Sequence, residues 1–138
     1  MKWIMAMTKT TVEQAEQLVV RAIEKLPELN PCGNGVPQKY YLLGKDVAGA
    51  EIRERQAGLF TEQSLMATAA CVDWLNSHPK GIRSSQDSYE AKHRVENWRA
   101  DNGEDFSYVS NGAFIAAGVG MGLRFKAGRP NVVFYRSR

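Results

Sequence analysis

The sequence predicts an α+β fold: one mainly helical domain over residues 1–138 that ends in a β-hairpin. Three observations predict it. Apolar residues recur at three- and four-residue steps in several segments. Apolar and charged residues alternate near the C-terminus. The chain has 138 residues and contains no linker or internal repeat that would divide it.

The N-terminal half predicts one clear helix followed by irregular structure. Residues 10–27 have an amphipathic pattern that begins at two threonines and ends at a proline. Residues 28–37 concentrate Pro, Gly and Asn, which predicts a loop. The aromatic and aliphatic run at 39–44 predicts a short strand. Residues 45–60 stay ambiguous, because their glycines disfavour the helix that the charge pattern allows.

The C-terminal half predicts two more helices before the glycine-rich region. Residues 61–77 are apolar on most of the helical circumference, so we expect them to form the central core helix. Residues 84–103 carry Asp87 followed three positions later by Glu90, which indicates a helix N-terminus.

The run GVGMG at residues 118–122 allows a phosphate-binding loop or a thin, close-packed helix. The spacing and position differ from a dinucleotide-binding fingerprint, which opens a helix after a strand. The helical interpretation gives a stripe of small residues, Gly112, Ala116 and Gly120, with Gly122 as the C-cap. We favour this helix and expect the stripe to pack on the helix at 86–101.

Residues 86–138 then predict a unit of helix, helix and hairpin, the order of a winged helix-turn-helix element. Leu123 to Tyr135 alternate around the turn sequence AGRPN, which gives a hairpin with a basic tip. The second helix has no Lys or Arg before the hairpin. Only Ser110 and Asn111 at its start could reach base edges.

The charge is unevenly distributed along the chain. Residues 1–78 hold eight Lys and Arg against nine Asp and Glu, whereas residues 79–138 hold ten against six. Residues 124–138 contain no acid. This asymmetry indicates a polyanionic or acidic partner for the C-terminal half.

Residues 88–134 also contain the pattern SYEAKHRVE, YVSNGAFIAA and NVVF. The pattern resembles one found near the C-terminus of small, mostly uncharacterised proteins of bacteriophages and mobile elements. The resemblance implies a phage or mobile-element origin. It implies no catalytic residues.

We therefore expect a non-enzymatic protein that binds nucleic acid, DNA ahead of RNA, through its basic C-terminal half. The alternative is a protein-binding inhibitor of a bacterial defence system, of the anti-CRISPR type, that docks on an acidic surface of a host complex. The candidate binding residues for either partner are Lys92, Arg94, Arg99, Ser110, Asn111, Arg124, Lys126, Arg129, Arg136 and Arg138.

No catalytic or metal site is expected. Cys32 and Cys71 lie far apart and the histidines are isolated, so no metal-ligand spacing is present and no cofactor is implied. A Ser110, His93 and Asp105 triad is conceivable, but the serine lacks the G-x-S-x-G elbow of such nucleophiles.

The N-terminus, MKWIMAM, lacks the long apolar run and cleavage site of a secretory signal, and we leave open that residues 1–8 are disordered. No stretch is apolar enough to span a membrane. We expect a protein of the bacterial host cytoplasm with no membrane contact, and the sequence does not indicate its oligomeric state.

Overall fold

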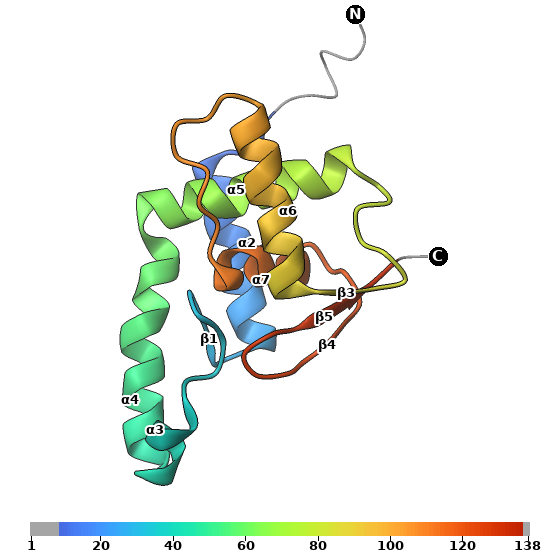
Figure 1. Ribbon diagram of the computed structural model, residues 1–138. Helices are drawn as coiled ribbons and strands as arrows, with labels where there is room; N and C mark the ends of the chain where they lie inside the picture. The colour runs from blue at the N-terminus through green and yellow to red at the C-terminus, as the bar shows by residue number, and fades with distance from the viewer. Residues whose placement is uncertain (1–8, 137–138) are drawn as a thin grey trace, which may run out of the picture.

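A computed structural model describes residues 9–136, which form a mainly helical α+β domain (Figure 1). Helices surround one interior helix, and two small antiparallel sheets complete the structure. In chain order the elements are α2 (Val12–Lys25), β1 (Leu29–Asn30), β2 (Gly33–Asn34), α3 (Gln38–Leu42), α4 (Lys45–Gln56), the 3₁₀ helix η1 (Ala57–Phe60), α5 (Glu62–Ser77), β3 (Ser85–Asp87), α6 (Ser88–Asp101), α7 (Asn111–Gly120), β4 (Phe125–Lys126) and β5 (Val133–Tyr135).

Short polar side chains start three of the predicted helices. Thr11 and Gln14 form a reciprocal capping box at the start of α2. Thr61 accepts a hydrogen bond from the Ser64 amide at α5, and Asp87 accepts two backbone N–H bonds at α6. These caps satisfy N–H groups that have no partner within the helix. The helix starts thus follow from local hydrogen bonding.

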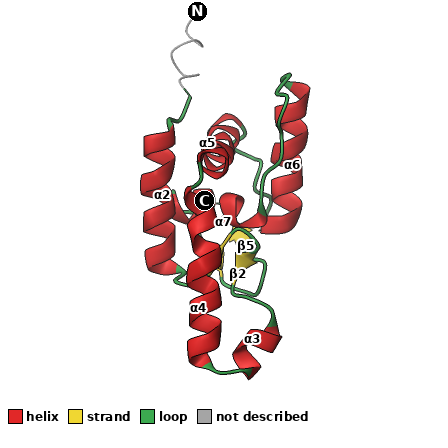
Figure 2. Cartoon of the chain, turned by 90° about the vertical axis from the view of Figure 1, so that its left-hand side faces the viewer, coloured by secondary structure: helices red, strands yellow, loops and turns green. Residues whose placement is uncertain are grey.

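The interior helix is α7, in which every residue from Asn111 to Gly120 is buried. It packs against α2, α5 and α6, which enclose it in Figure 2. The expectation that residues 61–77 form the central helix was wrong. Although α5 buries much of its surface, it leaves Met66 48% exposed, whereas α7 has no solvent-facing side.

Glycines set how closely other segments approach α7. A Cβ on Gly120 would lie 2.6 Å from a backbone carbonyl of α2, and one on Gly118 would lie 2.6 Å from the ring of Phe134. A Cβ on Gly112 would overlap the Asn30 carbonyl. The small-residue stripe therefore packs against α2 and β1. The expected packing of this stripe on α6 was wrong, because the closest backbone neighbours come from the N-terminal half of the chain.

The C-terminal hairpin follows α7 as predicted. Gly122 has a φ of +89°, which favours glycine, and leads into β4. The sheet has the order β3-β5-β4, with Phe134 of β5 opposite Gln86 and Phe125. The chain thus contains the predicted order of a helix (α6), a second helix (α7) and a hairpin (β4 and β5). However, α7 is excluded as a recognition helix, because a completely buried helix cannot enter a groove of DNA.

The α3–α4 arm, residues 38–56, projects from the rest of the domain (Figures 1 and 2). The predicted strand at 39–44 was wrong, since this segment forms α3. A short apolar run does not distinguish strand from helix, and here Tyr40 and Tyr41 pack with Val36, Ala48 and Ile52. This separate apolar cluster holds α3 against α4.

Replacing Gly112 with alanine should lower the free energy of unfolding by about 3 kcal/mol or more, because the added methyl group meets a rigid backbone carbonyl. Gly49→Ala in α4 is the matched control. Its Cβ meets only the flexible end of Arg53 at 3.3 Å, so we expect no loss, or a gain of about 0.5–1 kcal/mol. Urea denaturation of both variants measures the difference, and equal stabilities would contradict the close approach.

Candidate functional site

Two of the predicted binding cations are buried within the fold. Lys92 is 5% exposed and its Nζ lies 3.2 Å from a carboxylate oxygen of Glu96. Arg99 is 3% exposed and donates to the Glu104 carboxylate and to the Tyr108 carbonyl. They fasten the loop at 102–109 to α6. The prediction that they contact a partner was wrong, because their charges are used inside the domain.

Glu96 is the centre of this internal network. Its carboxylate accepts hydrogen bonds from the Val109 amide at 2.9 Å and from Lys92, and lies 2.9 Å from Nδ1 of His93. Burial alone would raise the pKa of Glu96, but these hydrogen bonds outweigh it and hold the pKa below its ordinary value. The network keeps the carboxylate ionised beside a buried lysine.

Ser110 and Asn111, predicted to reach a partner, are also buried. The Ser110 hydroxyl accepts from the Ala113 amide and caps α7. Asn111 accepts from the Ser88 hydroxyl at 2.9 Å and donates to the side-chain oxygen of Asn131 at 3.0 Å. Both residues therefore hold segments of the fold together, and the prediction that they contact a partner was wrong.

Asn111 also reaches the N-terminal half, since its amide nitrogen lies 3.3 Å from the Cys32 carbonyl. It thus joins the β1–β2 turn, the start of α6 and the C-terminal hairpin.

The conceivable triad does not assemble in the described part of the chain. Ser110 makes its hydroxyl contact with the α7 backbone, and His93 contacts Glu96 and the ring of Tyr89. Among residues 9–136, no hydrogen bond joins Ser110, His93 and Asp105. Within the same residues, no group of three or more His, Cys, Asp or Glu side chains is arranged to hold a metal ion.

Of the remaining predicted residues, Arg129 contacts a different part of the domain. Arg129 lies in the β4–β5 turn, 2.8 Å from a carboxylate oxygen of Glu28 and 4.6 Å from the ring centre of Tyr41. It therefore points toward the α3–α4 arm. Arg138 lies outside the described residues.

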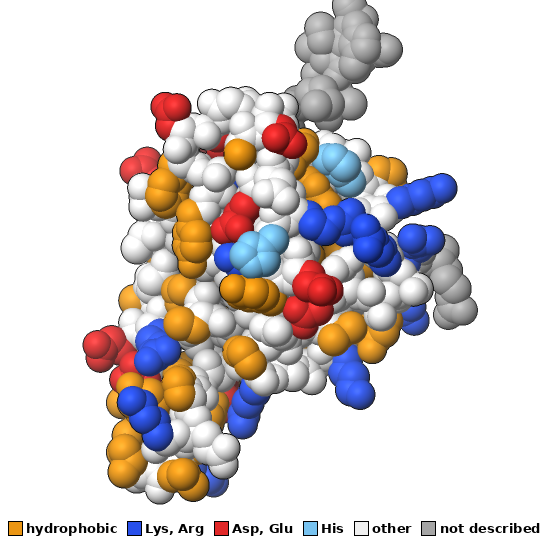
Figure 3. All heavy atoms as spheres, viewed as in Figure 1, with side chains coloured by type: hydrophobic (Ala, Val, Ile, Leu, Met, Phe, Trp, Pro, Cys, Tyr) orange, Lys and Arg blue, Asp and Glu red, His pale blue; other side chains and the backbone are white. Residues whose placement is uncertain are grey.

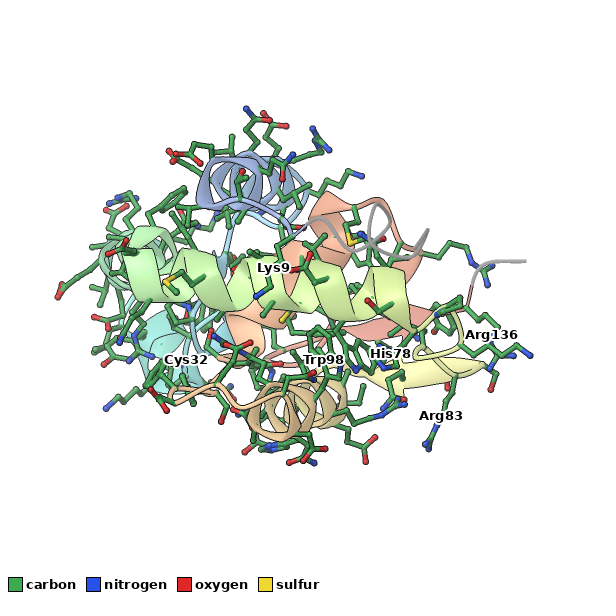
Figure 4. The ribbon with its side chains drawn as sticks, turned by 90° about the horizontal axis from the view of Figure 1, so that it is seen from above. Lys9, Cys32, His78, Arg83, Trp98 and Arg136 are labelled. Atoms are coloured by element: carbon green, nitrogen blue, oxygen red, sulfur yellow. The ribbon has the colours of Figure 1, made fainter. Side chains whose placement is uncertain are left out.

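Six cations gather at the other end of the domain, around the sheet and the loop at 78–84. Lys and Arg side chains are seen there on the right of Figure 3, and Figure 4 places Arg83 and Arg136 at this end. We call this set the basic surface. It comprises Lys80 and Arg83 of the loop, Arg94 of α6, and Arg124, Lys126 and Arg136 at the sheet.

Hydrogen bonds to the backbone position three of these arginines. Arg94 donates to the Gly81 carbonyl at 2.6 Å, and Arg136 donates to the Ile82 carbonyl at 3.2 Å. Arg124 donates to the Arg136 carbonyl and lies over the ring of Tyr135. Because Phe125 faces the core, strand alternation directs its two neighbours, one of which is Arg124, toward solvent.

Among the described residues, no carboxylate lies within 4 Å of any cation in the basic surface. Burial lowers the pKa of Arg94, and the nearby positive charge of Arg83 lowers it further, which places two like charges close together. Arg94 also lies over the Trp74 ring at 5.1 Å. The surface is thus a set of cations without an ion-pair partner in the described part of the chain, held partly in place by the fold.

Sequence reasoning named four members of this surface, Arg94, Arg124, Lys126 and Arg136, and missed Lys80 and Arg83. The missed pair lies in HPKGIRSS, which connects α5 to β3 and carries two cations and no acid. The loop contributed to the charge asymmetry. This excess of cations over acids within the loop was the signal in the sequence that could have identified Lys80 and Arg83.

In comparisons with known protein families, curated proteins and solved structures, nothing matched this chain. Across residues 9–136, no helix has both the length and the apolar character needed to cross a membrane.

Replacing Glu96 with glutamine should lower the free energy of unfolding by about 3 kcal/mol at pH 7, because it leaves Lys92 buried without its counter-charge. The pKa of Glu96 is lowered in the fold, so its contribution is present above the unfolded pKa and is lost as the pH falls through the folded pKa. The variant should therefore lose less stability in acid than the wild type. Urea denaturation from pH 7 to pH 3 measures both effects. Glu54→Gln, at an exposed site, is the control, and equal behaviour of the two variants would contradict the role of the network.

Proposed function

We propose that this chain is a non-enzymatic nucleic-acid-binding protein of the phage and mobile-element type, and that the basic surface contacts the phosphate backbone. The observation that carries the proposal is the group of six clustered cations with no carboxylate within ion-pair distance among the described residues. Arginine is suited to this role, because its planar guanidinium group matches phosphate oxygens in two-point contacts.

Such binding would be directed at the sugar–phosphate backbone of the nucleic acid, not at the bases. The residues that could have read bases from α7, Ser110 and Asn111, are engaged inside the fold. The cations come from the loop at 78–84, from the sheet and from α6, and α6 supplies only Arg94 because its other two cations, Lys92 and Arg99, are buried. The binding should therefore vary little with sequence and depend strongly on salt.

The cellular setting is part of the same proposal. The resemblance of residues 88–134 to phage and mobile-element proteins supports a role in the bacterial host cytoplasm, where DNA is the expected ligand ahead of RNA. Duplex and single-stranded DNA both present the phosphates that the basic surface would contact.

The test is a triple variant, Arg83→Gln, Arg124→Gln and Arg136→Gln, measured by fluorescence anisotropy with random duplex and single-stranded DNA. The wild type should bind at micromolar protein concentration in 50–100 mM salt. The triple variant should bind about tenfold or more weakly, and the slope of log affinity against log salt should become shallower by about three.

The matched control removes the same charge from the arm through Lys39→Gln, Lys45→Gln and Arg53→Gln, all at exposed positions. It should retain most of the wild-type affinity. Absence of wild-type binding in these conditions, or equal losses in both triple variants, would reject the basic surface as a nucleic-acid site.

A second candidate function is that of a protein-binding inhibitor of a bacterial defence system, and one observation favours it. Leu42 and Leu43 at the end of α3 are 77% and 69% exposed, and Val47 of α4 is 40% exposed. We call these three residues the apolar tip. Adjacent exposed leucines on a projecting arm are typical of a protein-binding site. The basic surface could add contacts to an acidic region of the same partner.

For this candidate, the double variant Leu42→Asp and Leu43→Asp should abolish stoichiometric capture of a partner from host lysate, because charge replaces the apolar contact. Val20→Asp, at a residue that is 46% exposed on α2, is the matched control and should leave capture unchanged. Capture that survives the double variant but is lost in the basic-surface triple variant would reject the tip and favour an acidic protein partner.

A further inference from the structure

A cavity of about 670 Å³ lies between the α3–α4 arm and the rest of the domain. Its walls come from the β1–β2 segment, from both arm helices and from the β4–β5 turn. Figure 4 places Cys32, one of its lining residues, at the end of the molecule opposite Arg83 and Arg136. The cavity is therefore separate from the basic surface. Its size is that of a small-molecule site.

The cavity has an apolar body. Val36, Pro37, Tyr41 and Pro130 supply flat or aliphatic surface to its walls. A mostly apolar lining with a few polar groups is typical of pockets that hold small organic ligands.

The only charged residues that line the cavity among those described are two arginines. Arg55 of α4 donates through Nε to Glu51, and Arg129 donates through one Nη to Glu28. These two glutamates hold the guanidinium groups but do not line the cavity. A guanidinium group has five N–H donors, and the hydrogen bonds seen among the described residues engage only some of them. Donors thus remain for an anion.

Hydrogen bonds and close packing hold the walls of the pocket in place without a ligand. The Tyr41 hydroxyl donates to Glu28 at 2.6 Å and accepts from the Val36 amide at 3.1 Å, while Arg129 lies over its ring. Gly35 brings its backbone so close that a Cβ there would lie 2.8 Å from the Tyr41 hydroxyl. Preformed walls lower the ordering cost of binding.

We propose that this cavity binds a small organic anion, a carboxylate or phosphate attached to a flat apolar group. The anionic group contacts the guanidinium groups of Arg55 and Arg129, and the apolar group packs on Tyr41, Val36 and Pro130. This site is independent of the proposed nucleic-acid function.

Cys32 provides a direct readout of occupancy. It is the exposed cysteine and lines the cavity, with the Nη1 atom of Arg55 3.6 Å from its sulfur. Cys71, the other cysteine of the chain, is buried, and burial raises the pKa of its thiol, so it should react slowly. The rate of reaction with Ellman's reagent in the folded protein therefore reports on Cys32.

The probe is 8-anilinonaphthalene-1-sulfonate, an anion on a flat apolar body, and N-phenyl-1-naphthylamine is its uncharged counterpart. At ten times the dissociation constant, the sulfonate should slow the reaction of Cys32 about tenfold, because only the unoccupied fraction reacts. N-phenyl-1-naphthylamine should slow the reaction of Cys32 far less. No protection at millimolar sulfonate, or equal protection by both compounds, would overturn the proposal.

Variants locate the anion contact. Arg55→Gln and Arg129→Gln should each weaken the binding of the sulfonate about tenfold, as expected for loss of a charged hydrogen bond. Arg53→Gln removes the same charge from the exposed side of α4 and should leave the affinity unchanged, as should the basic-surface triple variant. Wild-type affinity in both pocket variants would overturn the assignment. If a pocket variant fails to fold, protection of Cys32 in the wild type still decides the question.

Competition identifies the anionic group. Phenyl phosphate or benzoate in excess should displace the sulfonate and restore the reactivity of Cys32, and the stronger competitor assigns the site to phosphate or carboxylate. Benzyl alcohol, which has the ring without the charge, should not displace it. Displacement by benzyl alcohol alone would contradict an anion site.

Discussion

The complete burial of α7 is the constraint on which the rest of the structure depends. A ten-residue helix with no solvent-facing side needs neighbours on all sides, and its glycines allow α2, the Asn30 backbone and the Phe134 ring to approach closely. Since α7 fills the core, the C-terminal unit has a hairpin but no exposed second helix. A partner must therefore contact other parts of the surface, such as the loops, the sheet edge, the arm or the outer faces of α2 and α6. The cations of the basic surface accordingly lie elsewhere, in the loop at 78–84, on α6 and at the ends of β4 and β5.

The polar start of α7 connects parts of the chain that are distant in sequence. Asn111 contacts Ser88, Asn131 and the carbonyl of Cys32, and so joins three segments at one buried amide. A buried amide is costly unless its hydrogen bonds are satisfied, so these contacts fix the segments relative to one another. The same junction positions the β4–β5 turn, from which Arg129 reaches the Tyr41 ring of the arm. One polar side chain in the core thus helps to shape the cavity at the surface.

The two ends of the domain differ in how their cations are used. At the sheet end, Arg94 and Arg136 donate to backbone carbonyls and keep their charge unneutralised by carboxylates in the described chain. At the arm end, Arg55 and Arg129 are each held by a glutamate that lies outside the cavity lining. The first arrangement suits an extended polyanion, whose many phosphates add weak contacts. The second suits a single anionic group on a small molecule, because two oriented guanidinium groups limit where it can lie.

The sequence by itself determined the features that depend on near neighbours. Caps such as Thr61 and Asp87, the glycine end of α7 and the excess of cations after residue 78 all arise from hydrogen bonds, backbone conformation or counts within a few residues. Only the tertiary structure decided which cations remain available. Lys92 and Arg94 are two positions apart on α6, yet one is neutralised in the core by Glu96 and the other lies beside Arg83 at the surface. Likewise, the helix at Gln38–Leu42 and the burial of α7 depend on packing partners from distant parts of the chain, which periodicity within a segment does not contain.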